Sequence, residues 1–65
     1  MIIVEYGNDL FTVEDFYYNS KEHYIKIYYK GNHNSRLIQG VKCVAFYGNG
    51  ILRLTLYREG EDEKT

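Results

Sequence analysis

The chain has 65 residues and a formal net charge of −1, and 45% of its residues are hydrophobic and 17% aromatic. These values indicate one small folded domain and exclude an intrinsically disordered chain, and no apolar run reaches the roughly 18 residues of a membrane-spanning helix. A single cysteine, Cys43, excludes both a disulfide framework and a cysteine-rich zinc module.

In chain order, alternating hydrophobicity predicts five β-strands, at residues 1–6, 10–18, 22–30, 36–47 and 51–58. The alternation is clearest around Ile25 and Ile27 in the third strand and along the leucines of the fifth. A glycine at Gln39-Gly40 interrupts an apolar run, so we expect the fourth strand to break or bulge there. The sequence therefore predicts a single all-β domain over residues 1–59 and an acidic, frayed tail at 60–65. We expect a five-stranded antiparallel meander that forms either a curled sheet or a small barrel.

Residues 12–16 have a second interpretation. Thr12 and Asp15 have the spacing of a helix capping box, in which the two side chains satisfy the first backbone N–H groups of a helix. One short helical turn near 12–16 is therefore the alternative to a continuous strand.

Two segments, Tyr6-Gly7-Asn8-Asp9 and Tyr47-Gly48-Asn49-Gly50, are near copies and predict tight hairpins, because glycine and asparagine tolerate positive φ. For the second hairpin we expect a three-residue loop with Gly50 left-handed. That register gives a predicted core of Ile25, Ile27, Val44, Phe46, Leu52, Leu54 and Leu56. A two-residue loop would instead align Cys43, Ala45 and Tyr47 with the leucines.

The sequence offers little for catalysis or metal binding. Cys43 has His23 and His33 as possible partners, but it lies in the middle of a predicted strand, where a lone cysteine is usually a small packing residue. The histidines and the cysteine lack the short paired spacings of zinc ligands, and no glycine-rich phosphate loop is present. We therefore expect no enzyme activity, no metal site and no cofactor.

The charges are distributed unevenly. Between residues 20 and 42 the chain has five basic residues and one acidic residue, whereas the remainder is acidic. Within this segment tyrosines and lysines alternate on the third strand, and a flexible basic loop follows. These residues are the candidate partner-binding site: Tyr24, Lys26, Tyr28, Lys30, His33 and Arg36.

Alternating tyrosine and lysine side chains suit two kinds of partner. Tyrosine supplies large contact area at a protein interface, and the same rings and ammonium groups could stack bases and meet the phosphates of single-stranded nucleic acid. The net charge of −1 favours the protein partner, because nucleic-acid binders are usually basic. A third possibility is that the tyrosines only cover neighbouring strands while the lysines solvate the face.

The sequence thus predicts a non-catalytic, intracellular protein-binding module, such as a phage or mobile-element inhibitor of a host enzyme or defence complex. The alternatives are a small β-barrel that binds single-stranded nucleic acid and a structural subunit that assembles through its edge strands. Exposed aromatics and open edges favour a homodimer.

We also expect a cytoplasmic location. The lone cysteine fits a reducing compartment, and the run Met1–Val4 lacks the basic flank of a signal peptide. Residues with AT-rich codons far outnumber Gly, Ala, Arg and Pro, which points to a low-GC bacterial or phage genome.

Overall fold

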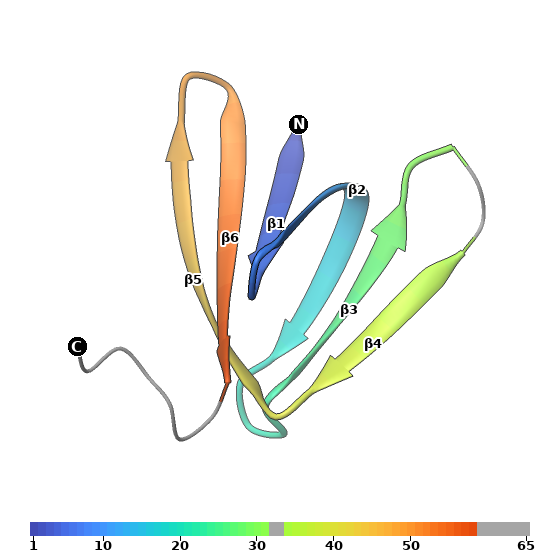
Figure 1. Cartoon of the computed structure of the whole chain (residues 1–65), viewed down its shortest axis with the longest axis vertical. Coiled ribbons are helices and arrows are strands. Elements are labelled where there is room, and N and C mark those ends of the chain that lie inside the picture. Colours follow the sequence, from blue (N-terminus) through green and yellow to red (C-terminus); the bar gives the residue numbers. More distant parts are fainter. Residues whose placement is uncertain (32–33, 59–65) are drawn as a thin grey trace.

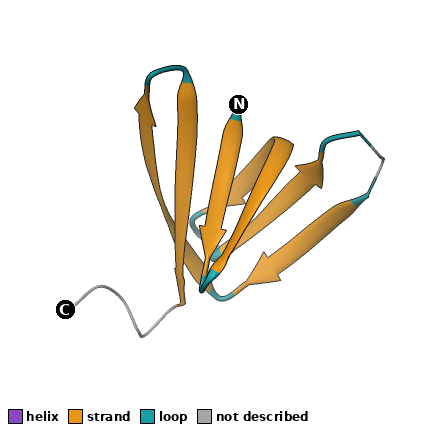
Figure 2. Ribbon diagram, turned by 45° about the horizontal axis from the view of Figure 1, so that its top comes forward, coloured by secondary structure: helices purple, strands orange, loops and turns teal. Residues whose placement is uncertain are grey.

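The computed structural model describes residues 1–31 and 34–58, and within them it contains strands, turns and no helix (Figures 1 and 2). The six strands are β1 (Ile2–Tyr6), β2 (Asp9–Asn19), β3 (Tyr24–Tyr29), β4 (Ser35–Gln39), β5 (Val41–Gly48) and β6 (Ile51–Arg58). The all-β prediction is confirmed. No segment of this described part is a helix long and apolar enough to cross a membrane.

The strands form one mixed sheet in the order β4-β3-β2-β1-β6-β5. The prediction of a five-stranded antiparallel meander is wrong in two respects, because there are six strands and because β1 pairs with β6 in parallel. A small barrel is also excluded, since β4 and β5 end the sheet as unpaired edges. Alternation of side chains reports a strand but not its pairing partner, so the parallel pair leaves no local signal in the sequence.

The predicted break at Gln39-Gly40 is confirmed, and it separates two strands that lie at opposite edges of the sheet. Gly40 has φ +75°, which reverses the chain between β4 and β5. The backbone N–H groups of Gly40 and Val41 donate to the carbonyl oxygen of His23 at 2.7 and 3.0 Å, and the Tyr18 hydroxyl donates to the Val41 carbonyl at 3.3 Å. The sheet is therefore folded at this corner, and its two halves diverge away from it (Figure 1).

The helical turn near 12–16 is wrong, because these residues lie inside β2 at a bulge between Val13 and Asp15. One Asp15 carboxylate oxygen (Oδ1) accepts a hydrogen bond from the backbone N–H of Phe16 at 2.8 Å. An aspartate that accepts a hydrogen bond from nearby backbone can stabilise a bulge as well as a helix start. The spacing of Thr12 and Asp15 therefore does not distinguish the two. The bulge divides β2 into a first part that pairs with β1 and a second part that pairs with β3.

One side of the sheet, the inner face, carries the core. The fully or nearly buried side chains are Val4, Val13, Ile25, Ile27, Ile38, Val41, Leu54 and Leu56. Leu52 is partly buried and packs against this cluster. The opposite side of the sheet is the outer face.

Val44 and Phe46 are wrongly predicted as core, since they are 54% and 72% exposed on the outer face. The hairpin has a two-residue loop of Asn49 and Gly50, both with positive φ, and the register pairs Ala45 with Leu54. Two left-handed residues give a type I′ turn, whose twist matches that of the strands. This twist match favours the two-residue loop over better core filling.

Candidate functional site

The outer face of β2, β3 and β4 carries a cluster of aromatic and aliphatic side chains. Lys26 is opposite Tyr17 on one neighbouring strand and opposite Leu37 on the other. Tyr24 and Tyr28 lie two residues away from Lys26 along β3, on the same face, because side chains alternate between faces. We call the five residues the tyrosine–lysine patch: Tyr17, Tyr24, Lys26, Tyr28 and Leu37.

The patch is open to solvent, and two pairs of its side chains lie close together. Tyr17 is 55% and Leu37 51% exposed. The Lys26 ammonium nitrogen lies 5.5 Å from the centroid of the Tyr28 ring, within the range of a cation–π interaction. The ring centroids of Tyr17 and Tyr24 are 6.2 Å apart at an interplanar angle of 52°. These contacts restrict the side chains before any partner binds, which lowers the entropy lost on binding.

Three of the six predicted site residues are brought together in the patch: Tyr24, Lys26 and Tyr28. Lys30 lies just beyond the end of β3 and is exposed, and His33 lies outside the described residues. Tyr17 and Leu37 were missed by sequence reasoning, because only the pairing of β2 and β4 with β3 places them beside Lys26.

Arg36 does not join the patch. It is paired with Ile27, so its side chain belongs to the inner face. There its guanidinium carbon lies 6.0 Å from the ring centroid of Tyr6 and 5.6 Å from that of Phe11. Phe11 in turn contacts the ring of Tyr29 edge-on, with centroids 6.2 Å apart. Arg36 therefore stacks over aromatic rings packed against the core and stabilises the fold from that position.

The basic segment of the sequence is dispersed by the fold. Lys26 is on the outer face of β3, Arg36 is on the inner face, and Lys42 lies on β5 at the other edge. On the three strands of the patch, Asp15 is opposite Tyr28, so a carboxylate accompanies the one lysine. The patch is therefore close to neutral, with aromatic and apolar groups as its main feature.

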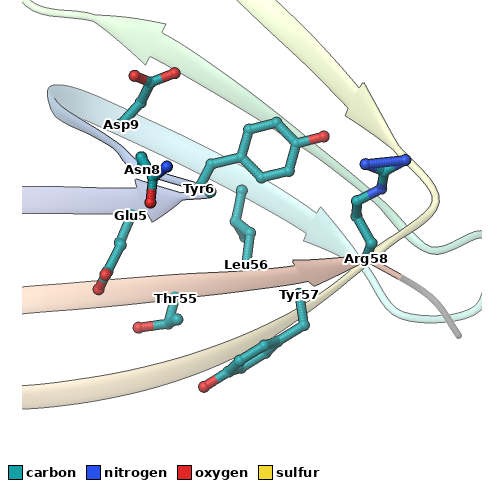
Figure 3. Close-up of a pocket in the computed structure, with 9 residues that line it drawn as sticks. Glu5, Tyr6, Asn8, Asp9, Thr55, Leu56, Tyr57 and Arg58 are labelled. Carbon is teal, nitrogen blue, oxygen red and sulfur yellow. The ribbon is translucent and has the colours of Figure 1, made fainter. Parts of the chain in front are cut away.

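A cavity of about 670 Å³ lies where β1 ends beside the longer β6, and it is lined by residues 5–9 and 55–58. Figure 3 shows that the Glu5 and Asp9 carboxylates point away from each other. Tyr6, Leu56 and Arg58 lie on one side of the sheet, and Thr55 and Tyr57 lie on the other. The acidic groups thus do not converge as a general acid–base pair requires.

Within the described residues, no three His, Cys, Asp or Glu side chains gather in a way that could hold a metal ion. Cys43 packs against the core cluster, as expected for a lone cysteine in a strand. Burial raises the pKa of the Cys43 thiol above its ordinary value, which reduces the thiolate needed for nucleophilic chemistry.

The chain matches no family model, no curated protein and no solved structure.

Proposed function

We propose that this chain is a non-catalytic protein-binding module and that the tyrosine–lysine patch contacts the partner protein. The observation that supports this proposal is the exposure of adjacent tyrosine and leucine side chains on one nearly neutral sheet face. Tyrosine is enriched at the energetic centres of protein interfaces, where large rings exclude water. If the patch covers the functional surface of the partner, the partner is inhibited. This is the mode of action that we propose.

The chemistry of the patch also defines the partner surface. Tyr17 and Leu37 flank Lys26 and present apolar area on both sides of it. A complementary surface would cover that area with apolar groups and offer oxygen acceptors to the tyrosine hydroxyls and to the ammonium group. It would carry little net charge, because the patch itself is nearly neutral.

Single-stranded nucleic acid fits the patch less well. A nucleic-acid platform combines stacking rings with a basic path for the phosphates, but Asp15 accompanies Lys26 and the other basic residues are dispersed. Binding to labelled oligonucleotides at about 50 mM salt should therefore be absent. Tight binding that weakens with salt, with a slope near 0.7 per phosphate contacted, would support nucleic acid instead.

The binding experiment uses the chain as bait in a low-GC bacterial lysate, with and without nuclease. The test variant is Tyr17→Ala combined with Tyr28→Ala, and the control is Thr12→Ala, which is exposed on the outer face but outside the patch. A specific partner should be recovered by wild type and control and reduced at least about tenfold by the test variant. Equal recovery by the test variant, or loss on nuclease treatment, would contradict the proposal.

A further inference from the structure

Strand β5 is an edge strand, and most of the backbone groups on its outward side have no partner among the described residues. In a hairpin closed by a two-residue turn, the pair beside the turn is hydrogen-bonded, and bonded and non-bonded pairs alternate from there. Gly48 and Ile51 are that pair. The N–H and C=O groups of Cys43, Ala45 and Tyr47 therefore point away from β6. Those of Val41 also point outward, but they already bond to His23 and Tyr18.

This edge lacks the features that usually block strand addition. Proteins protect edges with charges, proline, bulges or short strands. β5 is eight residues long with regular pairing, and its one charged residue, Lys42, lies near the end at the folded corner. Away from this corner, β5 diverges from β4 (Figures 1 and 2). Val44, Phe46 and Tyr47 extend from it as exposed apolar side chains.

We propose that β5 pairs with β5 of a second copy of this chain, antiparallel and around a twofold axis through Ala45. In this register Ala45 faces Ala45 of the second copy, and Cys43 faces Tyr47 in both directions. All three of these residues have outward backbone groups, so each facing pair exchanges two hydrogen bonds. The free edge is therefore complementary to itself, as a twofold interface requires.

The side chains agree with the same register. On the outer face Val44 lies opposite Phe46 of the second copy, and the twofold axis repeats this contact. These residues form a non-hydrogen-bonded pair, in which the side chains approach most closely. Lys42 lies opposite Gly48, so no like charges meet. Ala45, a small side chain, occupies the position where two identical residues must face each other.

The exposed aromatic residues of β5 supply about half of the area that a small dimer buries. Phe46 and Tyr47 are 72% and 70% exposed. With about 150–250 Å² for each fully buried aromatic residue, the four rings of two copies offer about 400–700 Å². A specific interface needs about 1,200 Å² in total. Val44 and the two backbone edges supply further area.

This inference goes beyond the proposed function and uses a different part of the sheet. A twofold axis perpendicular to the sheet keeps both outer faces on the same side. The tyrosine–lysine patches of the two copies would therefore face the same direction, and the dimer could engage two sites of one partner at once.

The experiment introduces a positive or a negative charge at Ala45, which is exposed in the single chain. Sedimentation from about 10 µM to 1 mM should show wild type at twice the 7.7 kDa chain mass. Ala45→Lys and Ala45→Glu should each be monomeric, because like charges would face each other across the axis. An equimolar mixture of the two should dimerise again. Ser35→Lys, on the opposite edge strand β4, is the control and should dimerise as wild type does.

Several results would overturn the β5 pairing. These are a wild type that stays monomeric at about 1 mM, an Ala45→Lys variant that dimerises, a mixture that fails to associate, and a Ser35→Lys variant that becomes monomeric. Amide NMR spectra establish that each variant is folded. A mixed sample of labelled and unlabelled wild type needs no variant. It should give NOEs between Val44 of one copy and Phe46 of the other, and their absence would contradict the register.

Discussion

The two tight hairpins share the residues Tyr-Gly-Asn but turn at different places. In the first, Tyr6 pairs with Asp9, and of the two loop residues only Gly7 has positive φ, at +64°. This pattern is that of a type II′ turn. In the second, Gly48 pairs with Ile51, and both loop residues have positive φ, which is the pattern of type I′.

The fourth residue explains the difference. Asp9 in the first hairpin corresponds to Gly50 in the second. A type I′ turn needs positive φ twice, and Asn-Gly supplies it at low cost, whereas Asn8-Asp9 would place two non-glycine residues there. Gly50 therefore allows the second turn to form one residue further along the chain.

A shift of one residue in the turn changes the pairing by two residues. The side chains keep their faces, but the bonded and non-bonded pairs exchange places. If the second hairpin turned at Gly48-Asn49, the outward backbone groups of β5 would belong to Val44 and Phe46 and no longer to Ala45. The position of a two-residue turn thus determines which backbone groups an edge strand offers to a partner.

The largest expected effect is a difference in stability between truncations on the inner and the outer face of the second hairpin. Leu54→Ala should lower the free energy of unfolding by about 2–5 kcal/mol, because Leu54 is fully buried and truncation leaves a cavity. Phe46→Ala should change it by less than about 0.5 kcal/mol, because Phe46 is mostly exposed. Both are measured by denaturant unfolding in the Ala45→Lys background, which removes association. A cost above about 2 kcal/mol for Phe46→Ala would show that this side chain is in the core.

The second-largest effect is a difference between the two turns in the cost of replacing their glycines. Gly7→Ala and Gly7→Asn should each cost about 1–3 kcal/mol, because the first central position of a type II′ turn is accessible essentially only to glycine. Gly50→Asn should cost less than Gly50→Ala, because asparagine tolerates the left-handed region. Gly48→Ala is the matched control, since Gly48 has no positive φ and a Cβ there meets Phe46 at an ordinary 3.7 Å. Equal costs at Gly7 and Gly50 for asparagine would contradict the assignment of two turn types.

The smallest effect concerns Arg36, whose guanidinium reaches the ring of Tyr6 beside the first turn. Arg36→Gln should cost about 0.5–1 kcal/mol through loss of the cation–π contacts. Hydrogen exchange should speed up at the amides of the first hairpin and stay unchanged at the second. Faster exchange in both hairpins alike would indicate a general loss of packing.

Much of the local structure was accessible from the sequence. Alternation around Ile25 and Leu54 gave the strands and their buried faces, and Gly40 marked the break between β4 and β5. The parallel pairing of β1 with β6 was not accessible, because it depends on contacts between distant segments. The predicted three-residue loop of the second hairpin is wrong, because the geometry of the Asn-Gly turn outweighs core filling there.

The candidate site shows the same division between local and long-range information. Tyr24, Lys26 and Tyr28 could be placed on one face from strand periodicity alone. Leu37 joins them through the pairing of β4 with β3, which the sequence does not display. Arg36 was expected to follow the flexible basic loop, and the pairing of β4 with β3 instead turns its side chain to the inner face, because the strand register decides the face.

The register of β5 against β6 determines both which apolar side chains are exposed and which backbone groups lie on the free edge. NMR tests this register most directly. Non-hydrogen-bonded antiparallel pairs bring their Cα atoms to about 4.5 Å, close enough for a strong NOE between the two Hα protons. We predict such NOEs between Ala45 and Leu54 and between Cys43 and Leu56. An Hα–Hα NOE from Leu54 to Val44 would contradict the account, because it would require a three-residue loop with Val44 and Phe46 in the core.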